Sequence, residues 1–198
     1  MSTLSKSYLT PEQYLEIERK AEFKSEYFNG EMFAMSGARE PHVLISGNAY
    51  RELSQQLRKR PCLAYNADMR IRVSDTGLYT YPDLSVVCGE PQFLDENRET
   101  LLNPTVIIEV LSESTEAYDR GQKFELYRSV ESLSEYLLIS SRRISAELFT
   151  RQPDGRWMLT AKNGLDDSIE LQSIGCQLLL ADLYEKTTIV PSHGYMVL

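Results

Sequence analysis

The stretch Thr105-Val106-Ile107-Ile108-Glu109-Val110-Leu111 decides the fold class of this 198-residue chain. It is apolar on both sides apart from Glu109, and such a run is typical of a central strand that is covered on both faces. A helical pattern follows at residues 119–129, and strand patterns then follow at residues 135–140, 144–150 and 157–161. This order predicts an α/β fold in which a mixed central sheet is flanked by helices.

The N-terminal part begins with a helix and a hairpin. Thr10, Pro11 and Gln13 form a capping-box pattern with proline at the first helical position, so a helix is expected to begin there. Asn29-Gly30 lies between two apolar, aromatic runs within residues 26–35, which is a strong hairpin signal. A second helix is predicted over residues 41–59, where apolar side chains recur at helical spacing.

The remaining elements complete one predicted domain. Strands are expected at residues 62–66, 69–73 and 79–87, with a turn at residues 75–77, and a short helix at residues 180–184. Domains commonly contain roughly 100–200 residues. We therefore expect residues 1–198 to form a single domain.

The charge of the chain is acidic and unevenly distributed. There are 21 Lys and Arg against 29 Asp and Glu, which gives a net charge of −8. Residues 39–72 carry seven basic and three acidic side chains, whereas residues 73–119 carry ten acids and one arginine. This balance argues against non-specific wrapping of nucleic acid. It leaves two interpretations open: a surface of scattered solvated charges, or carboxylates that hold a cation while arginines meet an anionic substrate.

Compartment and cysteine chemistry are also indicated by the sequence. The N-terminus has no apolar signal core and no stretch approaches the roughly 20 apolar residues of a membrane helix, so we expect a cytoplasmic protein. Cys62, Cys88 and Cys176 show no CxxC spacing. We therefore expect three reduced thiols, with neither a disulfide framework nor a thiolate zinc site.

Two acidic residues interrupt runs that are otherwise rich in β-forming residues. Asp83 follows Pro82 at the entrance of a strand, and Glu109 lies within the central apolar strand. Because an unpaired buried charge is costly, each carboxylate needs a partner. A salt bridge or hydrogen bonds would suffice for either residue alone. Together, two carboxylates on neighbouring strands predict a site for a hard cation such as Mg²⁺.

Basic side chains near these carboxylates are candidates for phosphate chemistry. Lys123 lies on the helix that follows the Glu109 strand, so its long stem could reach back to the carboxylates, although a solvated lysine is the simpler interpretation. An ammonium there could orient a nucleophile and offset charge in the transition state. Arg70 and Arg72 alternate along one predicted strand. They could approach phosphates, or could form surface pairs with Asp68 and Asp75.

An ordered series of motifs resembles a known family. These are Thr10-Pro11-Glu12-Gln13-Tyr14-Leu15, Glu26-Tyr27-Phe28-Asn29-Gly30-Glu31, His42, Asn66-Ala67-Asp68-Met69-Arg70, Tyr81-Pro82-Asp83, Glu109-Val110-Leu111-Ser112, and Asp119 with Lys123 and Tyr127. Over residues 8–190 the chain resembles the Uma-type restriction endonuclease family of the PD-(D/E)XK nuclease superfamily. The resemblance implies a restriction-endonuclease-like fold.

The same resemblance implies roles for individual residues. Asp83 and Glu109 would hold the metal, and Lys123 would position or activate the attacking water. The superfamily pattern places lysine where this chain has Leu111, so Lys123 would replace it from the following helix. His42 could meet the metal, a metal-bound water or a phosphate, or could be a hydrogen-bonded core histidine. Glu26 could be an additional ligand, or could pair with Lys24 or an arginine.

The expected function is magnesium-dependent hydrolysis of DNA phosphodiester bonds, with manganese as a possible substitute. A bound metal would lower the pKa of the attacking water and stabilise the phosphate transition state. A non-cutting DNA- or protein-binding regulatory module on the same scaffold is the main alternative. A phosphoesterase for a smaller substrate is a third interpretation. A homodimer is expected, because cutting two strands favours two-fold symmetry.

Overall fold

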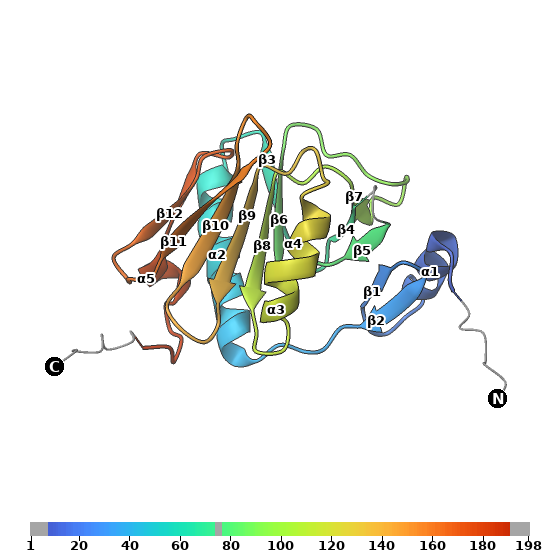
Figure 1. Cartoon of the computed structure of the whole chain (residues 1–198), viewed down its shortest axis with the longest axis horizontal. Helices are drawn as coiled ribbons and strands as arrows, with labels where there is room; N and C mark the ends of the chain where they lie inside the picture. Colours follow the sequence, from blue (N-terminus) through green and yellow to red (C-terminus); the bar gives the residue numbers. More distant parts are fainter. Residues whose placement is uncertain (1–7, 74–76, 191–198) are drawn as a thin grey trace.

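The computed structural model describes residues 8–73 and 77–190. Within these residues the strands form sheets of six, five and two strands. The six-stranded sheet lies at the centre, and the N-terminal helix and hairpin lie at one end of the molecule (Figure 1). The α/β class with a mixed central sheet, predicted from the sequence, is therefore confirmed. The predicted turn at residues 75–77 lies outside the described residues, except for Gly77.

The central sheet contains the apolar strand that decided the fold class. Its strand order is β11-β10-β9-β8-β6-β3, and β8 and β9 are parallel whereas the other neighbours are antiparallel. Every residue of β8 is buried, as expected for a strand covered on both faces. The strands of this sheet are β3 (Cys62–Asn66), β6 (Leu84–Cys88), β8 (Val106–Leu111), β9 (Glu135–Ser140), β10 (Ala146–Arg151) and β11 (Trp157–Lys162).

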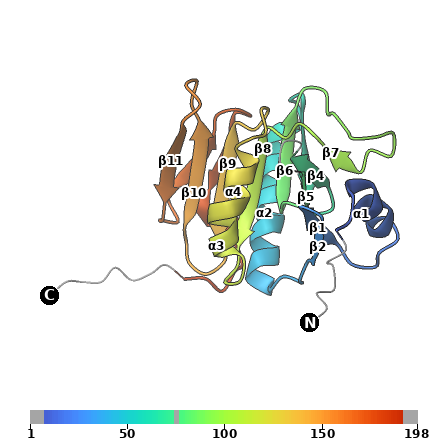
Figure 2. The same ribbon diagram turned by 45° about the vertical axis from the view of Figure 1, so that its right-hand side comes forward.

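Helix α2 (Glu40–Leu57) covers one face of the central sheet (Figures 1 and 2). Its buried side chains, including Ile45 and Leu53, pack in one core cluster with Val106 and Ile108 of β8. The same cluster contains side chains of β12 (Ser168–Leu171), β13 (Cys176–Leu179) and α5 (Leu180–Leu183). The C-terminal hairpin and helix therefore extend this covered face.

The other face is covered by a helical segment and by the second sheet. Ile107 and Leu111 of β8 belong to a second core cluster, together with Tyr127 of the segment and Ile71 and Leu78 of the second sheet. Glu109 lies between these two residues on the same face of β8, because every second side chain of a strand points to the same side. Its carboxylate therefore enters the space between the central sheet and the elements that cover this face. An acid at this depth needs partners from both covering elements.

The helical segment differs from the predicted helix over residues 119–129. It begins earlier, as α3 (Glu116–Tyr118), continues through a π-helical turn, η1 (Asp119–Lys123), and ends in α4 (Phe124–Tyr127). The predicted helix begins at Asp119, but this residue lies within the helical segment and its side chain is buried. Wide π turns of this kind often occur at functional sites.

The second sheet joins the N-terminal hairpin to the middle of the chain, in the order β2-β1-β5-β4-β7. The capping box of Thr10 and Gln13 is present at the start of α1 (Pro11–Glu18), and Asn29 and Gly30 both have the positive φ of a hairpin turn. The strands are β1 (Ser25–Phe28), β2 (Glu31–Ala34), β4 (Arg70–Val73), β5 (Leu78–Thr80) and β7 (Thr100–Leu101).

The prediction of one strand over residues 79–87 is wrong. β5 pairs with β4 in the second sheet, whereas β6 pairs with β8 in the central sheet. Pro82 lies between them and has no N–H to donate to a strand ladder, so the chain changes sheets there. Asp83 is consequently placed at the junction of the two sheets.

The expectation of three reduced thiols is wrong for two of the cysteines. Cys62 and Cys88 form a disulfide, and Cys176 is a buried free thiol. The bonded cysteines are 26 positions apart in the sequence, so the sequence does not show that β3 and β6 are neighbouring strands in which Cys62 lies directly opposite Cys88. Among the described helices, none combines the length and the apolar character needed to cross a membrane.

Thiol counting tests the cysteine assignment. Protein unfolded without reductant should take up one maleimide, on Cys176, and reduced protein should take up three, by intact mass. The variant Cys62→Ser should take up two without reductant, because Cys88 loses its partner. Three labels on unreduced wild-type protein would show that the disulfide is absent.

Candidate functional site

Asp83 and Glu109 meet where the two sheets join. Leu84 is the first residue of β6 and pairs with Ile108, so Asp83 comes next to Glu109 across the ladder. The Asp83 backbone N–H donates to Glu109 Oε2 at 3.3 Å, and the Val110 N–H donates to Asp83 Oδ2 at 2.7 Å. These reciprocal contacts fix both carboxylates to neighbouring strands.

Lys123 reaches back from the helical segment to this junction. Its Nζ lies 2.9 Å from Glu109 Oε1, 3.3 Å from Glu26 Oε1 and 3.5 Å from Asp119 Oδ1. Lys123 and Glu109 side chains are each 6% exposed. We call Lys123 with Glu26, Glu109 and Asp119 the buried cluster. The structure thus brings together three predicted site residues, Glu26, Glu109 and Lys123, and adds Asp119.

Two hydroxyl groups complete the hydrogen bonding of the buried cluster. The Tyr127 hydroxyl donates to Glu109 Oε1 at 2.9 Å, and the Thr80 hydroxyl donates to Glu26 Oε1. Thr80 and Glu26 belong to the second sheet, whereas Tyr127 belongs to α4. The central sheet, the second sheet and the helical segment therefore all supply groups to one buried polar network. Burial of such groups is costly in free energy unless each is paired.

The charges of the buried cluster shift the protonation equilibria of its members. Burial raises the pKa of Glu109 to about 8; Lys123 opposes this shift, and the charges of Asp119 and Asp83 add to it. Burial also raises the pKa of Asp119. For Lys123 burial acts in the opposite direction, but the charges of Glu109, Glu26 and Asp119 outweigh it and hold its pKa well above the usual value. Lys123 therefore stays protonated, and the carboxylates of Glu26, Glu109 and Asp119 compete for contact with its ammonium group.

His42 approaches the junction from the first turn of α2. Its Nε2 lies 3.2 Å from Asp83 Oδ2, and the two side chains are 16% and 17% exposed. Burial lowers the pKa of His42, but the hydrogen bond and the charge of Asp83 outweigh burial, and the net pKa is raised. Among the described residues, His42 Nδ1 is buried without a hydrogen-bond partner. His42 is thus a partner of Asp83 at the more open side of the junction.

The oxygen donors at this junction suit a hard cation. Magnesium keeps several waters and uses one or two carboxylates, which Asp83 and Glu109 offer from neighbouring strands. Over residues 8–73 and 77–190, no three or more His, Cys, Asp or Glu side chains are grouped so that they could hold a metal ion. Glu109 already accepts hydrogen bonds at both oxygens. Asp83 and Glu109 can hold magnesium if Glu109 gives up one of these hydrogen bonds to bind the ion.

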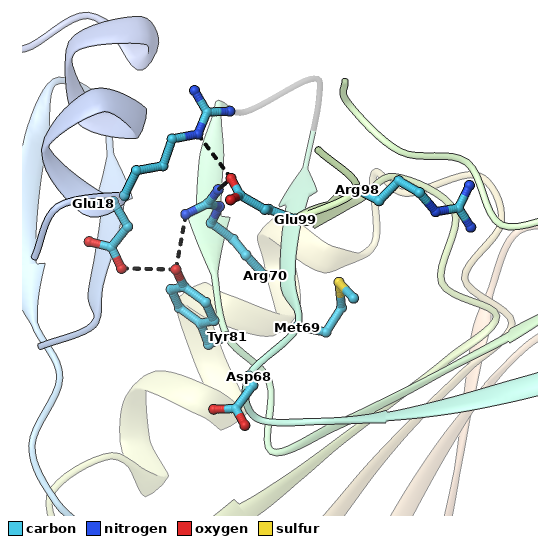
Figure 3. A pocket seen from close by; sticks show the side chains of 8 residues that line it. Glu18, Asp68, Met69, Arg70, Tyr81, Arg98 and Glu99 are labelled. Atoms are coloured by element: carbon cyan, nitrogen blue, oxygen red, sulfur yellow. Dashed lines mark hydrogen bonds and ion pairs between the residues drawn. The ribbon is translucent and has the colours of Figure 1, made fainter. Parts of the chain in front are cut away.

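Arg70 is placed in a different environment from the buried cluster. Its side chain is 4% exposed, and its guanidinium donates to Thr100 Oγ1 and to the Tyr81 hydroxyl, which in turn donates to Glu18. Figure 3 shows the contacts of Arg70 with Tyr81 and of Tyr81 with Glu18, in a pocket of about 340 Å³ that Glu99 also lines. Nε and Nη1 therefore donate within the protein, whereas Nη2 is buried, has no hydrogen-bond partner among the residues that the structure describes, and lies 3.8 Å from Glu99 Oε2. A phosphate contact by Arg70 stays a prediction.

Arg72 is half-buried, and its guanidinium lies over the Tyr79 ring at 5.7 Å from the ring centroid. The surface pairs considered for the two arginines are not seen among the described residues. Asp68 pairs with Lys24, and Asp75 lies outside the described residues. A phosphate contact by Arg72 stays a prediction.

Sequence reasoning assigned no role to Asp119, Tyr127 or Thr80 in the buried cluster. The four-residue spacing of Asp119 and Lys123 was a usable signal, because such residues meet on a helix. Nothing local in the sequence indicates that Thr80 donates to Glu26, since the two residues are 54 positions apart.

Comparisons with known proteins show the family of this chain. Residues 11–181 match the Uma2 family, described as a putative restriction endonuclease. Two proteins from Synechocystis sp. (strain ATCC 27184 / PCC 6803 / Kazusa) are similar over most of their length. The uncharacterized protein slr1290 is 37% identical over 176 residues, which cover 89% of this chain and 91% of the relative. The uncharacterized protein sll1609 is 36% identical over 162 residues, which cover 82% and 92%.

One solved structure shares the fold. It is the crystal structure of a putative nuclease belonging to DUF820 from Anabaena variabilis ATCC 29413, with a TM-score of 0.72 and 18% sequence identity. The likeness covers 89% of this chain and 97% of that chain. At this identity it concerns the fold alone, and it confirms the restriction-endonuclease-like fold expected from the sequence.

The raised pKa of Glu109 predicts how stability changes with pH in the presence of a chelator. Between its ordinary value of 4.5 and about 8, the unfolded state loses the proton that the folded state keeps, so the free energy of unfolding falls as pH rises. Above about pH 8 the contribution is lost. The variant Glu109→Gln cannot titrate, so the stability difference between wild type and variant should fall from pH 5 to pH 8 in urea unfolding. A difference that is constant with pH would contradict the assignment.

Proposed function

Because the chain belongs to the Uma2 family, described as a putative restriction endonuclease, we propose that it is a metal-dependent endonuclease that hydrolyses DNA phosphodiester bonds. The observation that carries the proposal is the contact of Lys123 Nζ with Glu109 Oε1 at 2.9 Å, beside Asp83. Two neighbouring acids and a lysine supply the groups that the superfamily pattern requires, in the same chain order, but the lysine comes from the following helix and not from the position of Leu111.

The charge of the junction supports a requirement for a cation. Asp83, Glu26 and Asp119 outnumber Lys123 and His42, and Glu109, whose pKa is raised to about 8, adds a fourth negative charge when it loses its proton. A DNA phosphate would be repelled by this excess of negative charge. A divalent cation would reverse the local charge and make the junction receptive to an anionic substrate.

Asp83 and Glu109 would hold the cation, with Mg²⁺ as the proposed ion and Mn²⁺ as its substitute. When bound, such an ion would supply an activated water and stabilise negative charge on the phosphate. Asp83 is positioned for this by the Val110 N–H and by His42, both of which contact Oδ2. The two contacts hold the carboxylate in place before any ion or substrate arrives.

The proposed role of Lys123 is to orient the attacking water or to neutralise charge on the phosphate. Its raised pKa keeps it protonated, so it acts as a hydrogen-bond donor and not as a base. His42 is protonated more readily than a free histidine and could donate to a phosphate oxygen from the open side of Asp83. We propose that these two cations flank the scissile phosphate.

The proposed substrate is DNA, and the proposed assembly is a homodimer in the cytoplasm. Two active sites related by two-fold symmetry would match the two strands of a duplex. A non-cutting regulatory module is the competing function, and the closed contacts of Lys123 with three carboxylates are the observation that favours it. In that case the buried cluster would serve only to hold the layers together.

Cleavage of supercoiled plasmid with Mg²⁺ or Mn²⁺ distinguishes these functions. Wild type should nick or linearise the plasmid, and Lys123→Ala should lower the rate by about 10²–10³-fold, the usual effect of removing one group that stabilises transition-state charge. Lys20→Ala is the matched control, because Lys20 is 74% exposed and pairs with Glu16 on the surface of α1. Folding of each variant is checked by circular dichroism.

Asp83→Asn should respond differently in the same assay. It weakens the proposed ion site itself, so raising the Mg²⁺ concentration should partly restore its rate, whereas Lys123→Ala should not be restored. If wild type leaves plasmid and oligonucleotide duplexes intact with both ions, the regulatory module becomes the better description.

A further inference from the structure

We propose that Lys123 is the internal counter-ion of the acidic junction and competes with the divalent cation for Glu109. When the cation binds, the ammonium passes to Glu26 and Asp119. The inference rests on the proposed metal site but assigns a new function to these two carboxylates. They are positioning residues that receive the lysine, and they are not ligands of the ion.

The first observation is that both oxygens of Glu109 are already engaged. Its Oε1 accepts from Tyr127 and contacts the Lys123 ammonium, while its Oε2 accepts from the Asp83 N–H. A cation beside Oε1 would lie within a few ångströms of the ammonium, and like charges at that separation repel strongly in a buried site. A cation that binds Glu109 therefore competes with Lys123 for this carboxylate.

The second observation is that a destination already exists. Glu26 Oε1 and Asp119 Oδ1 lie 3.3 Å and 3.5 Å from Lys123 Nζ, slightly farther than Glu109 Oε1 at 2.9 Å. A small rotation of the flexible lysine stem can exchange the nearest partner without moving the backbone. Because three carboxylates surround one ammonium, the two that remain can neutralise it after Glu109 turns to the cation.

The third observation concerns how the two receiving carboxylates are held. Asp119 precedes Lys123 by four residues across the π turn, and Glu26 enters from strand β1 and accepts from Thr80. Both positions are fixed independently of Glu109. The two receiving carboxylates therefore stay in place whether or not the ion is bound. Lys123 can then change partners without any rearrangement of the surrounding structure.

Calorimetric titration of chelator-treated protein with Mn²⁺ alone tests the exchange without relying on cleavage. Lys123→Met removes the competing charge and should tighten Mn²⁺ binding by about 10- to 100-fold, the range over which neighbours of metal ligands change affinity. Lys123→Arg keeps the charge and is the matched control, with an affinity close to that of wild type. Tighter binding by Lys123→Met alone supports competition, whereas unchanged or weaker binding overturns it.

A double-mutant cycle separates a receiving carboxylate from a metal ligand. Glu26→Gln should weaken Mn²⁺ binding in wild type, because the displaced ammonium loses a partner. It should have no effect in the Lys123→Met background, where no ammonium needs a partner. If Glu26→Gln weakens binding equally in both backgrounds, Glu26 is a ligand of the ion and the inference is wrong.

The outcomes also distinguish the inference from the function on which it rests. If wild type binds Mn²⁺ and cuts DNA while Lys123→Met binds no more tightly, the nuclease stands and the competition fails. If neither protein binds Mn²⁺, both fail. Should Lys123→Met fold only when Mn²⁺ is present, that dependence is itself the expected sign that one cation replaces the other. If it does not fold at all, Glu26→Gln in wild type decides, and undiminished Mn²⁺ binding overturns the inference.

Discussion

The arrangement of the whole molecule depends on one buried ammonium. Lys123 lies between carboxylates from strand β1, strand β8 and its own helical segment. Removing one partner of such a pair leaves an uncompensated charge in the interior, which is far more costly than losing a surface pair. The second sheet, the central sheet and the covering helix are therefore held in one mutual register by charge as well as by apolar packing.

The position of Pro82 explains why the acids meet where they do. The chain leaves the second sheet after β5 and enters the central sheet at β6, and Asp83 lies at that change. A continuous strand would have kept Asp83 within a single ladder. The crossing instead exposes its carboxylate to His42 on one side and brings its N–H to Glu109 on the other.

Local signals in the sequence predicted the elements that are determined locally. The capping box of Thr10, the Asn29-Gly30 turn and the apolar run of β8 around Glu109 are each visible within a few residues, and each is present as predicted. The family resemblance, and not any local pattern, indicated Glu26 and His42. Properties that depend on strand order were not predictable: Cys62 and Cys88 become neighbours only through the pairing of β3 with β6.

Errors arose where tertiary contacts override local preference. The helix predicted to begin at Asp119 begins earlier, and the Asp119 carboxylate is buried beside Lys123. Arg70 is buried with Thr100 and Tyr81 and does not form the surface pair with Asp68 that was one interpretation of the sequence, because Asp68 pairs with Lys24. In both cases the charged side chain contacts residues that become its neighbours only in the folded chain, so a short stretch of sequence does not reveal them.

Crystals grown with Mn²⁺ and a short DNA duplex would test the central claim most directly, through the anomalous signal of the ion. The account predicts a Mn²⁺ peak bound by Asp83 and Glu109, with Lys123 shifted toward Glu26 and Asp119 and a phosphate beside the ion. A peak bound elsewhere, or no peak between Asp83 and Glu109 at saturating Mn²⁺, would contradict it.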